Sequence, residues 1–184
     1  MTGEQAAALL DEHIQSDVLK KHCIATEAIM RALAERFGED PGTWGIAGLL
    51  HDIDFEYTKD TPTEHGVKAM DLLAGSGLSE DVMQAIARHN AEMLNLERQT
   101  RLDFALTCAE TITGLIVAAA LVHPDKKIAS LKTKSIRKRM KSKDFARAVS
   151  REHIALCEQI EIPLDDFIDL SLRAMESVHE QLGL

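Results

Sequence analysis

The chain has 184 residues, a length that suits one domain with a substantial hydrophobic core. Apolar residues make up 45% of it and charged residues 28%, which excludes a disordered or collagen-like chain. Five Phe, one Trp and one Tyr are the only large aromatic residues, whereas helix formers such as Ala, Leu, Met and Glu are abundant. The composition therefore favours helices over strands.

Neither a membrane span nor a disulfide framework is expected. The longest uninterrupted apolar run, Gly114 to Val122, is shorter than the roughly 17–25 residues of a membrane-spanning helix. The first five residues, Met1 to Gln5, are acidic rather than basic, unlike a secretory signal. Cys23, Cys108 and Cys157 are odd in number and far apart in the sequence, so we expect reduced, buried thiols. We interpret the chain as a soluble protein of the cytoplasm.

The first half of the chain predicts a series of helices. After an acidic amphipathic helix, a longer one is expected from Asp17 to Phe37, with an apolar stripe and Gly38 as its stop. The apolar segment from Trp44 to Ile53 predicts a buried helix that ends in His51 and Asp52.

Three further helices are expected before residue 123. A loop from Asp54 to Pro62 leads to a helix at about Thr63 to Ala74. Ser79, followed by two acids, predicts the start of a helix that reaches Arg88 or His89. The segment from Leu102 to Val122 is apolar nearly all round, so we expect it in the core.

Charge is distributed unevenly along the chain. Residues Lys126 to Arg151 include eleven Lys or Arg and one acid, a net charge of +10, while the rest of the chain carries −19. Such a segment is typical of a solvated helix face, of a site that attracts an anion, or of a contact with acidic surface on the same or another chain. We expect one or two short helices here, the second capped by Ser142, and a last amphipathic helix over residues 163–182. The whole sequence, residues 1–184, predicts a single-domain all-α bundle.

Four residues with ligand-type side chains occupy unusual positions. His51 and Asp52 follow an apolar run, where burying both is costly unless they bind each other, a hydrogen-bond network or a metal. His22 lies on the inward face of its helix, and Glu110 sits in the middle of the most apolar helix. Imidazole nitrogens and carboxylate oxygens of this kind are ligands for divalent metals.

These residues resemble the HD superfamily of metal-dependent phosphohydrolases, whose pattern is His, then His-Asp, then Asp on a helical bundle. The similarity covers about residues 19–114 and is nearest to the HDIG-like subgroup, although this chain has His51-Asp52-Ile53-Asp54 in place of the common His-Asp-Ile-Gly. The matching stretches are Leu19 to His22, Gly48 to Ile53 and Ala109 to Gly114, with Glu110 in place of the usual Asp. Two more stretches, His65-Gly66 and Ala85 to His89, are similar to those that supply a second metal in part of the family.

The resemblance implies a metal site and a reaction. His22, His51, Asp52 and Glu110 would hold a first divalent metal, and His65 and His89 a second. The metals considered are Mn, Fe, Ni, Zn and Mg.

The carboxylates and the basic segment would have further roles in such a site. Asp52 is the best candidate to bridge two cations, because a carboxylate can bind both, and Asp54 is a candidate to accept a proton or position water. In the basic segment, the candidate contacts to substrate phosphate are Lys132, Lys134, Arg137 and Lys138.

We therefore expect hydrolysis of a nucleotide or another small phosphate ester. Nucleic acid is disfavoured as a partner, because only Phe145 in the basic segment can stack on a base and the acidic body repels a long polyanion. Two alternatives stay open: a two-iron HD-type oxygenase, and a non-catalytic module that binds a nucleotide. The sequence makes no prediction of oligomeric state.

Overall fold

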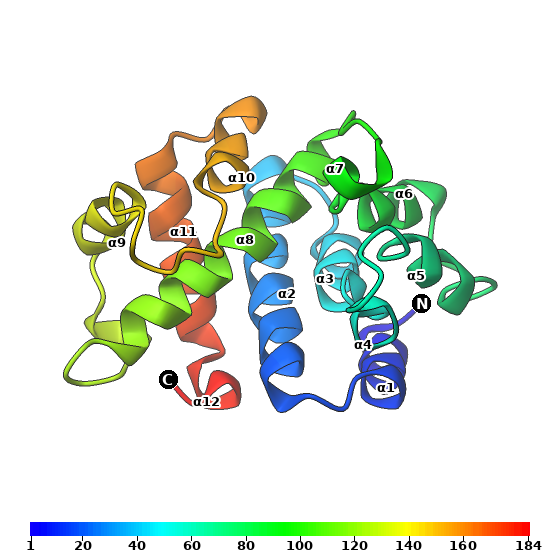
Figure 1. Cartoon of the computed structure of the whole chain (residues 1–184), viewed down its shortest axis with the longest axis horizontal. Helices are drawn as coiled ribbons and strands as arrows, with labels where there is room; N and C mark the ends of the chain where they lie inside the picture. The colour runs from blue at the N-terminus through cyan, green and yellow to red at the C-terminus, as the bar shows by residue number, and fades with distance from the viewer.

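The computed structural model describes residues 1–184 and consists of helices joined by turns and loops, without strands (Figure 1). The expected all-α class is confirmed. The α-helices are α1 (Gly3–His13), α2 (Asp17–Phe37), α3 (Pro41–Leu50), α4 (Phe55–Thr58), α5 (Val67–Leu72), α6 (Glu80–Arg88), α7 (Ala91–Leu94), α8 (Arg101–Leu121), α9 (Thr133–Met140), α10 (Arg151–Ala155), α11 (Leu164–Ser177) and α12 (His179–Leu182). Two 3₁₀ helices span Ile128–Ser130 and Leu156–Ile160.

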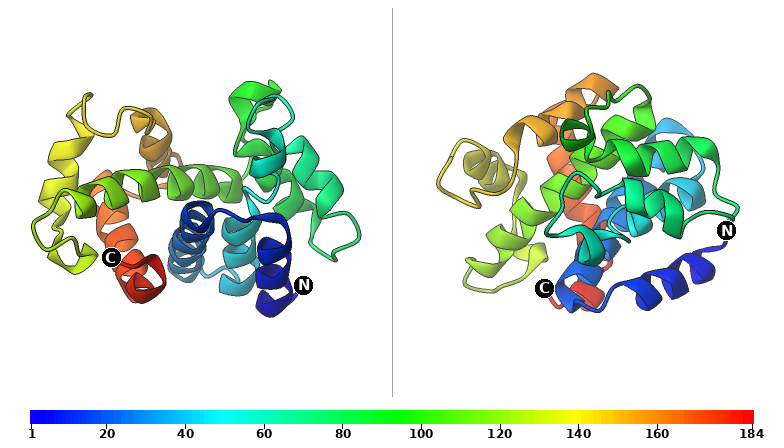
Figure 2. Two further views of the ribbon diagram at one scale, coloured as in Figure 1. Left: turned by 60° about the horizontal axis from the view of Figure 1, so that its bottom comes forward. Right: turned by 45° about the vertical axis from the view of Figure 1, so that its right-hand side comes forward.

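Helices α2 and α8 form the centre of the molecule. Helix α8 crosses α2 and extends across the width of the protein (Figures 1 and 2). Helices α3 to α7 lie on one side of this crossing, and α9 to α11 lie on the other. The C-terminal helix α12 packs beside the start of α2, at the lower edge in Figure 1.

The helix ends follow local sequence signals. The side chain of Ser16 accepts a hydrogen bond from the backbone N–H of Leu19, and α2 ends at Gly38, whose φ of 72° is left-handed. Asp40 caps α3 in the same way, with Pro41 in its first turn. These signals fix the bounds of helices by satisfying free backbone groups at their ends. The predicted 17–37 helix is confirmed, and the buried helix that leads to His51 ends one residue before it.

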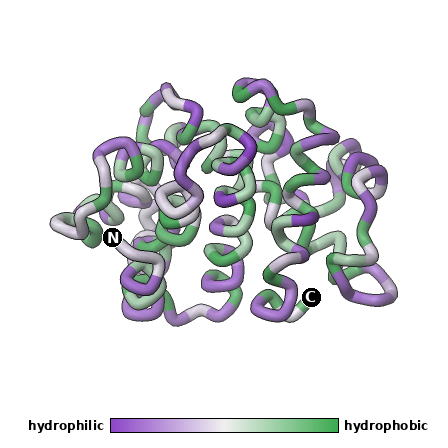
Figure 3. Tube along the Cα trace, turned by 180° about the vertical axis from the view of Figure 1, so that it is seen from behind, coloured by the Kyte–Doolittle hydropathy of each residue, from purple (hydrophilic) through white to green (hydrophobic).

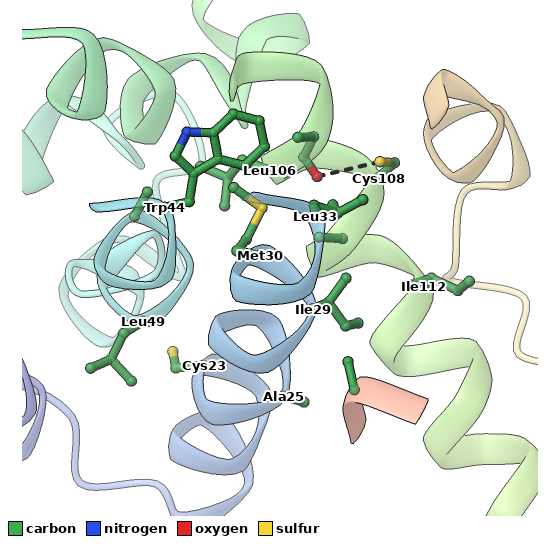
Figure 4. Close-up of a cluster of buried hydrophobic side chains, with 14 of the residues drawn as sticks. Cys23, Ala25, Ile29, Met30, Leu33, Trp44, Leu49, Leu106, Cys108 and Ile112 are labelled. Atoms are coloured by element: carbon green, nitrogen blue, oxygen red, sulfur yellow. Dashed lines mark hydrogen bonds between the residues drawn. The ribbon is translucent and has the colours of Figure 1, made fainter. Parts of the chain in front are cut away.

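The core is one continuous cluster of 42 buried apolar residues that runs from Ala6 to Leu182. Figure 4 shows part of it, where Met30 of α2, Trp44 of α3 and Leu106 of α8 meet. Seen from behind, apolar and polar residues alternate along the helices (Figure 3), as expected when each helix turns one face inward.

Helix α8 matches its predicted place in the core. By length and composition alone it is apolar enough to cross a membrane, yet 67% of its most apolar stretch is buried inside the protein. The three cysteines are free and buried, as expected, and burial raises the pKa of the Cys23 and Cys108 thiols well above the usual range.

Some predicted elements differ from the structure. The expected helix over residues 63–74 is reduced to α5, because the backbone turns at Gly66, whose φ is 90°. Part of the expected 54–62 loop forms α4. The prediction that Ser142 caps a helix is wrong, because Ser150 caps α10 instead. The C-terminal helix is also interrupted, at Val178.

The basic segment contacts acidic residues of the same chain. Helix α9 packs against α11, where Arg137 pairs with Asp165 at 3.2 Å and the Thr133 hydroxyl donates to Asp169 at 3.3 Å. Farther along the segment, the guanidinium of Arg151 donates to the backbone carbonyls of the preceding loop and fixes its path.

Candidate metal centre

Four histidines surround Asp52 at the end of α3. Oδ2 of Asp52 lies 3.6 Å from Nε2 of His22 and 3.5 Å from Nε2 of His51. Oδ1 lies 3.2 Å from Nε2 of His65 and 3.5 Å from Nε2 of His89. Each carboxylate oxygen of Asp52 therefore faces its own pair of imidazole nitrogens.

These side chains come from separate parts of the sequence. His22 projects from the first half of α2, and His51 and Asp52 directly follow α3. His65 lies in the turn before α5, and His89 directly follows α6. Four of the five therefore lie in the turn at a helix end, where the chain changes direction and the side chains can converge.

The close approach of α2 and α3 depends on a glycine. A Cβ at Gly48 would lie 2.9 Å from the carbonyl oxygen of Thr26 and 3.0 Å from the backbone of Glu27. Because backbone atoms cannot yield as a flexible side chain does, only glycine fits this crossing. The crossing in turn brings His51 within 3.1 Å of His22, measured between their Nε2 atoms.

The outer nitrogen of every histidine is held by a group outside the cluster. Nδ1 of His22 contacts the hydroxyl of Thr113, and Nδ1 of His65 contacts the carboxylate of Asp54. Nδ1 of His51 and Nδ1 of His89 contact backbone carbonyls, those of Gly48 and Ile86 respectively. A carbonyl or carboxylate partner requires the proton on Nδ1, which leaves Nε2 free to bind a metal. The outer contacts therefore set the tautomer that metal binding needs.

The spacing of the inner atoms fits metal ligation. Ligand atoms about 2.0–2.1 Å from a metal lie about 2.9–3.4 Å apart in octahedral or tetrahedral geometry. The Nε2 atoms of His65 and His89 are 2.9 Å apart, and those of His22 and His51 are 3.1 Å apart. Two groups of three potential ligands share Asp52: one with His22 and His51, the other with His65 and His89.

Burial and charge set the protonation of the first group. Burial lowers the pKa of His51 to about 3, so its imidazole is neutral at neutral pH. Burial opposes ionisation of Asp52, but the neighbouring His51 and the contacts with His65 and His89 outweigh it. The pKa of Asp52 therefore lies well below its usual range, and the carboxylate is charged.

His65 carries a proton when no metal is bound. Burial would lower its pKa, but the flanking carboxylates of Asp52 and Asp54 raise it to about 9. The imidazolium then lies between the two acids, with Nε2 toward Asp52 and Nδ1 toward Asp54. A metal on this side of Asp52 must displace that proton.

Asp54 holds His65 from outside the cluster. Its carboxylate is fully buried and accepts hydrogen bonds from His65 Nδ1 at 2.8 Å, from Gly66 N at 2.7 Å and from Ala69 N at 2.9 Å. These contacts orient the ring of His65, so Asp54 is a positioning residue for it. That Asp54 also accepts a proton or positions water stays a prediction.

Glu110 lies beside the cluster and belongs to neither group of three. Its Oε1 accepts a hydrogen bond from the hydroxyl of Thr111, and burial raises its pKa. Together with His22 it lines a cavity of about 330 Å³ that His153 closes from α10. The sequence around His153 gives no signal of this position, because only folding brings α10 beside Glu110.

The predicted phosphate contacts lie outside the two cavities next to the cluster. Lys132, Lys134, Arg137 and Lys138 line neither of the two cavities that His22 lines. Helix α9 packs against α11, and the part of the basic segment near Glu110 is residues 148–150. The contact of these four side chains with a substrate phosphate stays a prediction.

The outer residue Thr113 was also missed by the sequence analysis. Its hydroxyl lies 2.8 Å from Nδ1 of His22 and donates to the carbonyl of Glu110. A threonine in an apolar helix gives no signal of this role before the partner helix is placed.

Comparison with known proteins agrees with the geometry. No solved structure matches the chain at a significant level. The HD domain profile matches residues 19–121, more than half of the chain, and this stretch contains all four histidines of the cluster and Asp52. The chain belongs to the HD-domain family.

Proposed function

We propose that this protein is a metal-dependent phosphohydrolase of the cytoplasm, acting on a small phosphorylated substrate such as a nucleotide. HD domains belong to a superfamily of such hydrolases. The observation that carries the proposal is Asp52, whose two oxygens face two different pairs of imidazole nitrogens. This donor set suits one or two divalent ions, with His22, His51 and Asp52 at one and Asp52, His65 and His89 at the other.

A divalent metal held there would lower the pKa of a coordinated water toward neutrality and polarise a phosphate oxygen. The protein residues prepare the site for this chemistry. His51 is neutral at neutral pH and offers its nitrogen without losing a proton, whereas His65 must release one. Glu110, at the wall of the adjoining cavity and with a raised pKa, is suited to exchange a proton with the substrate.

Metal content tests the proposal most directly. Tag-free, desalted protein would be analysed by mass spectrometry beside His51→Ala and a control, His179→Ala, whose side chain is exposed on α12. We expect one or two equivalents of metal in the wild type and the control, and the loss in His51→Ala of the metal held by His22, His51 and Asp52. The same preparations would then be assayed for phosphate release from a panel of phosphate esters and nucleotides.

Each other outcome contradicts the proposal in a distinct way. Absence of metal after incubation with several divalent ions would leave the cluster as a hydrogen-bonded network. Bound iron with dioxygen consumption and no phosphate release would identify a two-iron oxygenase. Bound metal with nucleotide binding but no turnover would identify a binding module.

A further inference from the structure

A second cavity, of about 660 Å³, adjoins the metal centre between α2, α8 and α12. His22 is part of its wall, so the cavity reaches the first pair of histidines. Phe55 is also part of its wall and packs edge-on against the ring of His65, with 5.6 Å between ring centroids. The cavity therefore borders the cluster at His22, and Phe55 connects its wall to His65. The elements that form its wall include the start of α2, the second half of α8 and α12, which lie in the lower part of Figure 1.

The wall of this cavity is mainly apolar. It is formed largely by Val18, Leu19, Phe55, Val117, Leu121 and Leu182. The charged side chain at its edge is Lys21, which makes no ion pair within the chain. By contrast, the cavity on the other side of His22 is lined by Glu110, Ser150, His153 and other small or polar residues.

Several of these apolar side chains are left open to solvent. The exposed fraction is 80% for Val18, 54% for Leu121 and 42% for Phe55. Large apolar side chains gathered around one cavity are unfavourable in water and are typical of a ligand-binding site. An apolar ligand in the cavity would remove this surface from water.

We propose that the substrate is a phosphate ester with an apolar tail, such as an alkyl, acyl or isoprenoid chain. The phosphate would lie at the metal cluster and the tail would extend along the cavity past Val117 and Leu121. Lys21 supplies positive charge at the edge of the cavity, beside Gly183, which favours an anionic ligand. Hydrolysis would break the bond between phosphorus and the ester oxygen. The water oxygen would join phosphorus, and a proton would go to the departing alcohol.

The walls fit a tail better than a nucleoside. A base needs hydrogen-bond partners for its edge and an aromatic face to stack on. The wall has two rings, of which Phe55 is in a T-shaped contact with His65 and His22 belongs to the cluster around Asp52. The volume suits a small organic ligand. The inference rests on the proposed function for the phosphate end and on the cavity itself for the tail.

The test is the dependence of binding on chain length. Ethyl-, hexyl- and decylphosphonate, each below its micelle-forming concentration, would be titrated into the metal-loaded protein by calorimetry. We expect Kd to fall by about two- to fourfold per added methylene, since each buried methylene adds a roughly constant increment. The gain should stop once the cavity is filled.

Matched variants test whether the apolar tail lies along the cavity wall. Leu121→Gln and Val18→Gln should reduce the gain with chain length and leave ethylphosphonate binding unchanged. Val122→Gln is the control, because Val122 is 60% exposed and adjacent to Leu121 but does not line the cavity. Since Val18, Leu121 and Val122 are all exposed, these variants should fold, which thermal unfolding would verify.

The outcomes separate this inference from the proposed function. Metal-loaded protein with equal affinity for all three phosphonates would overturn the inference and leave the hydrolase proposal standing. If the protein binds none of the metals offered and still binds the phosphonates more tightly as the chain lengthens, the hydrolase proposal alone is overturned. Sedimentation of the wild type and of Leu121→Gln tests whether a second copy of the chain occupies this surface instead. A dimer that is lost in the variant, together with phosphonate affinity that does not depend on chain length, would show that it does.

Discussion

Whether each histidine can bind a metal depends on which of its two ring nitrogens makes a hydrogen bond to a group outside the cluster. Nδ1 of all four histidines contacts an outer group, so Nε2 points to Asp52. Such outer partners commonly matter almost as much as the ligands themselves, because they fix the orientation and the tautomer. Asp54 is the outer residue with the strongest effect to test.

Asp54→Asn should remove metal from one side of Asp52. The amide oxygen would accept from the Gly66 and Ala69 N–H groups, so the amide NH₂ would face His65 and force the imidazole proton onto Nε2. We expect metal affinity at His65 and His89 to fall about 10- to 100-fold. Calorimetric titration should show one metal retained. An unchanged titration would contradict the role of Asp54, and Asp60→Asn, at an exposed position, is the control.

Metal binding at His65 should depend on pH. The pKa of His65 in the metal-free protein is raised from 6.5 to about 9, so binding below pH 9 releases a proton. We expect metal affinity to rise about tenfold per pH unit from pH 6 to 9, with about one proton released at pH 7. Calorimetry in buffers of different ionisation enthalpy measures this number, and no proton release would contradict the assignment.

The same shift affects the stability of the metal-free protein in the opposite direction. Because the folded-state pKa of His65 lies above its ordinary value, its stabilising contribution is complete below about pH 6.5 and is lost as pH rises through about 9. Added metal should therefore stabilise the protein most at the alkaline end of this range.

At the scale of elements, the crossing of α2 and α3 sets the distance between His22 and His51. Gly48→Ala should place a methyl group against the backbone of Thr26 and Glu27. We expect a loss of about 1–3 kcal/mol in the free energy of unfolding, together with weaker metal binding, because the two helices must move apart. Denaturant unfolding of the metal-free protein measures the first effect.

A matched control separates crowding from a general effect of alanine. Gly3→Ala changes an exposed glycine in the first turn of α1, where the nearest atom is 3.9 Å from the added Cβ. It should leave stability and metal binding unchanged. If Gly48→Ala behaves like Gly3→Ala, the close crossing does not control the site.

At the scale of the whole molecule, metal bound at both groups of ligands would hold together α2, the end of α3, the turn before α5 and the end of α6. A ligand that binds only the folded chain stabilises it by about 2.7 kcal/mol at 100 times its Kd. For a protein of this size that corresponds to a rise in Tm of about 5–11 °C. Thermal unfolding with added metal should show the full rise in the wild type and a smaller rise in His51→Ala, which keeps only the ligands Asp52, His65 and His89.

The sequence by itself determined the class of fold, the approximate bounds of the two long helices α2 and α8, and the residue types at the site. Helix α2 and its caps could be predicted because Ser16, the apolar stripe and Gly38 act within a few residues of each other. The ligand residues His22, His51 and Asp52 could be identified because their surroundings are apolar in the sequence itself. Local patterns carry this information without knowledge of the partner helix.

Only the tertiary structure decided which groups face one another. In the folded chain, Asp54 is buried behind His65, and Glu110 lies beside the cluster but in neither group of ligands. Helix α9 packs against α11, away from the site. Each of these outcomes depends on contacts between residues far apart in the chain, whose geometry is set when helices pack. The apolar cavity beside His22 is of the same kind, since its wall combines Val18, Val117 and Leu182, which come together only after folding.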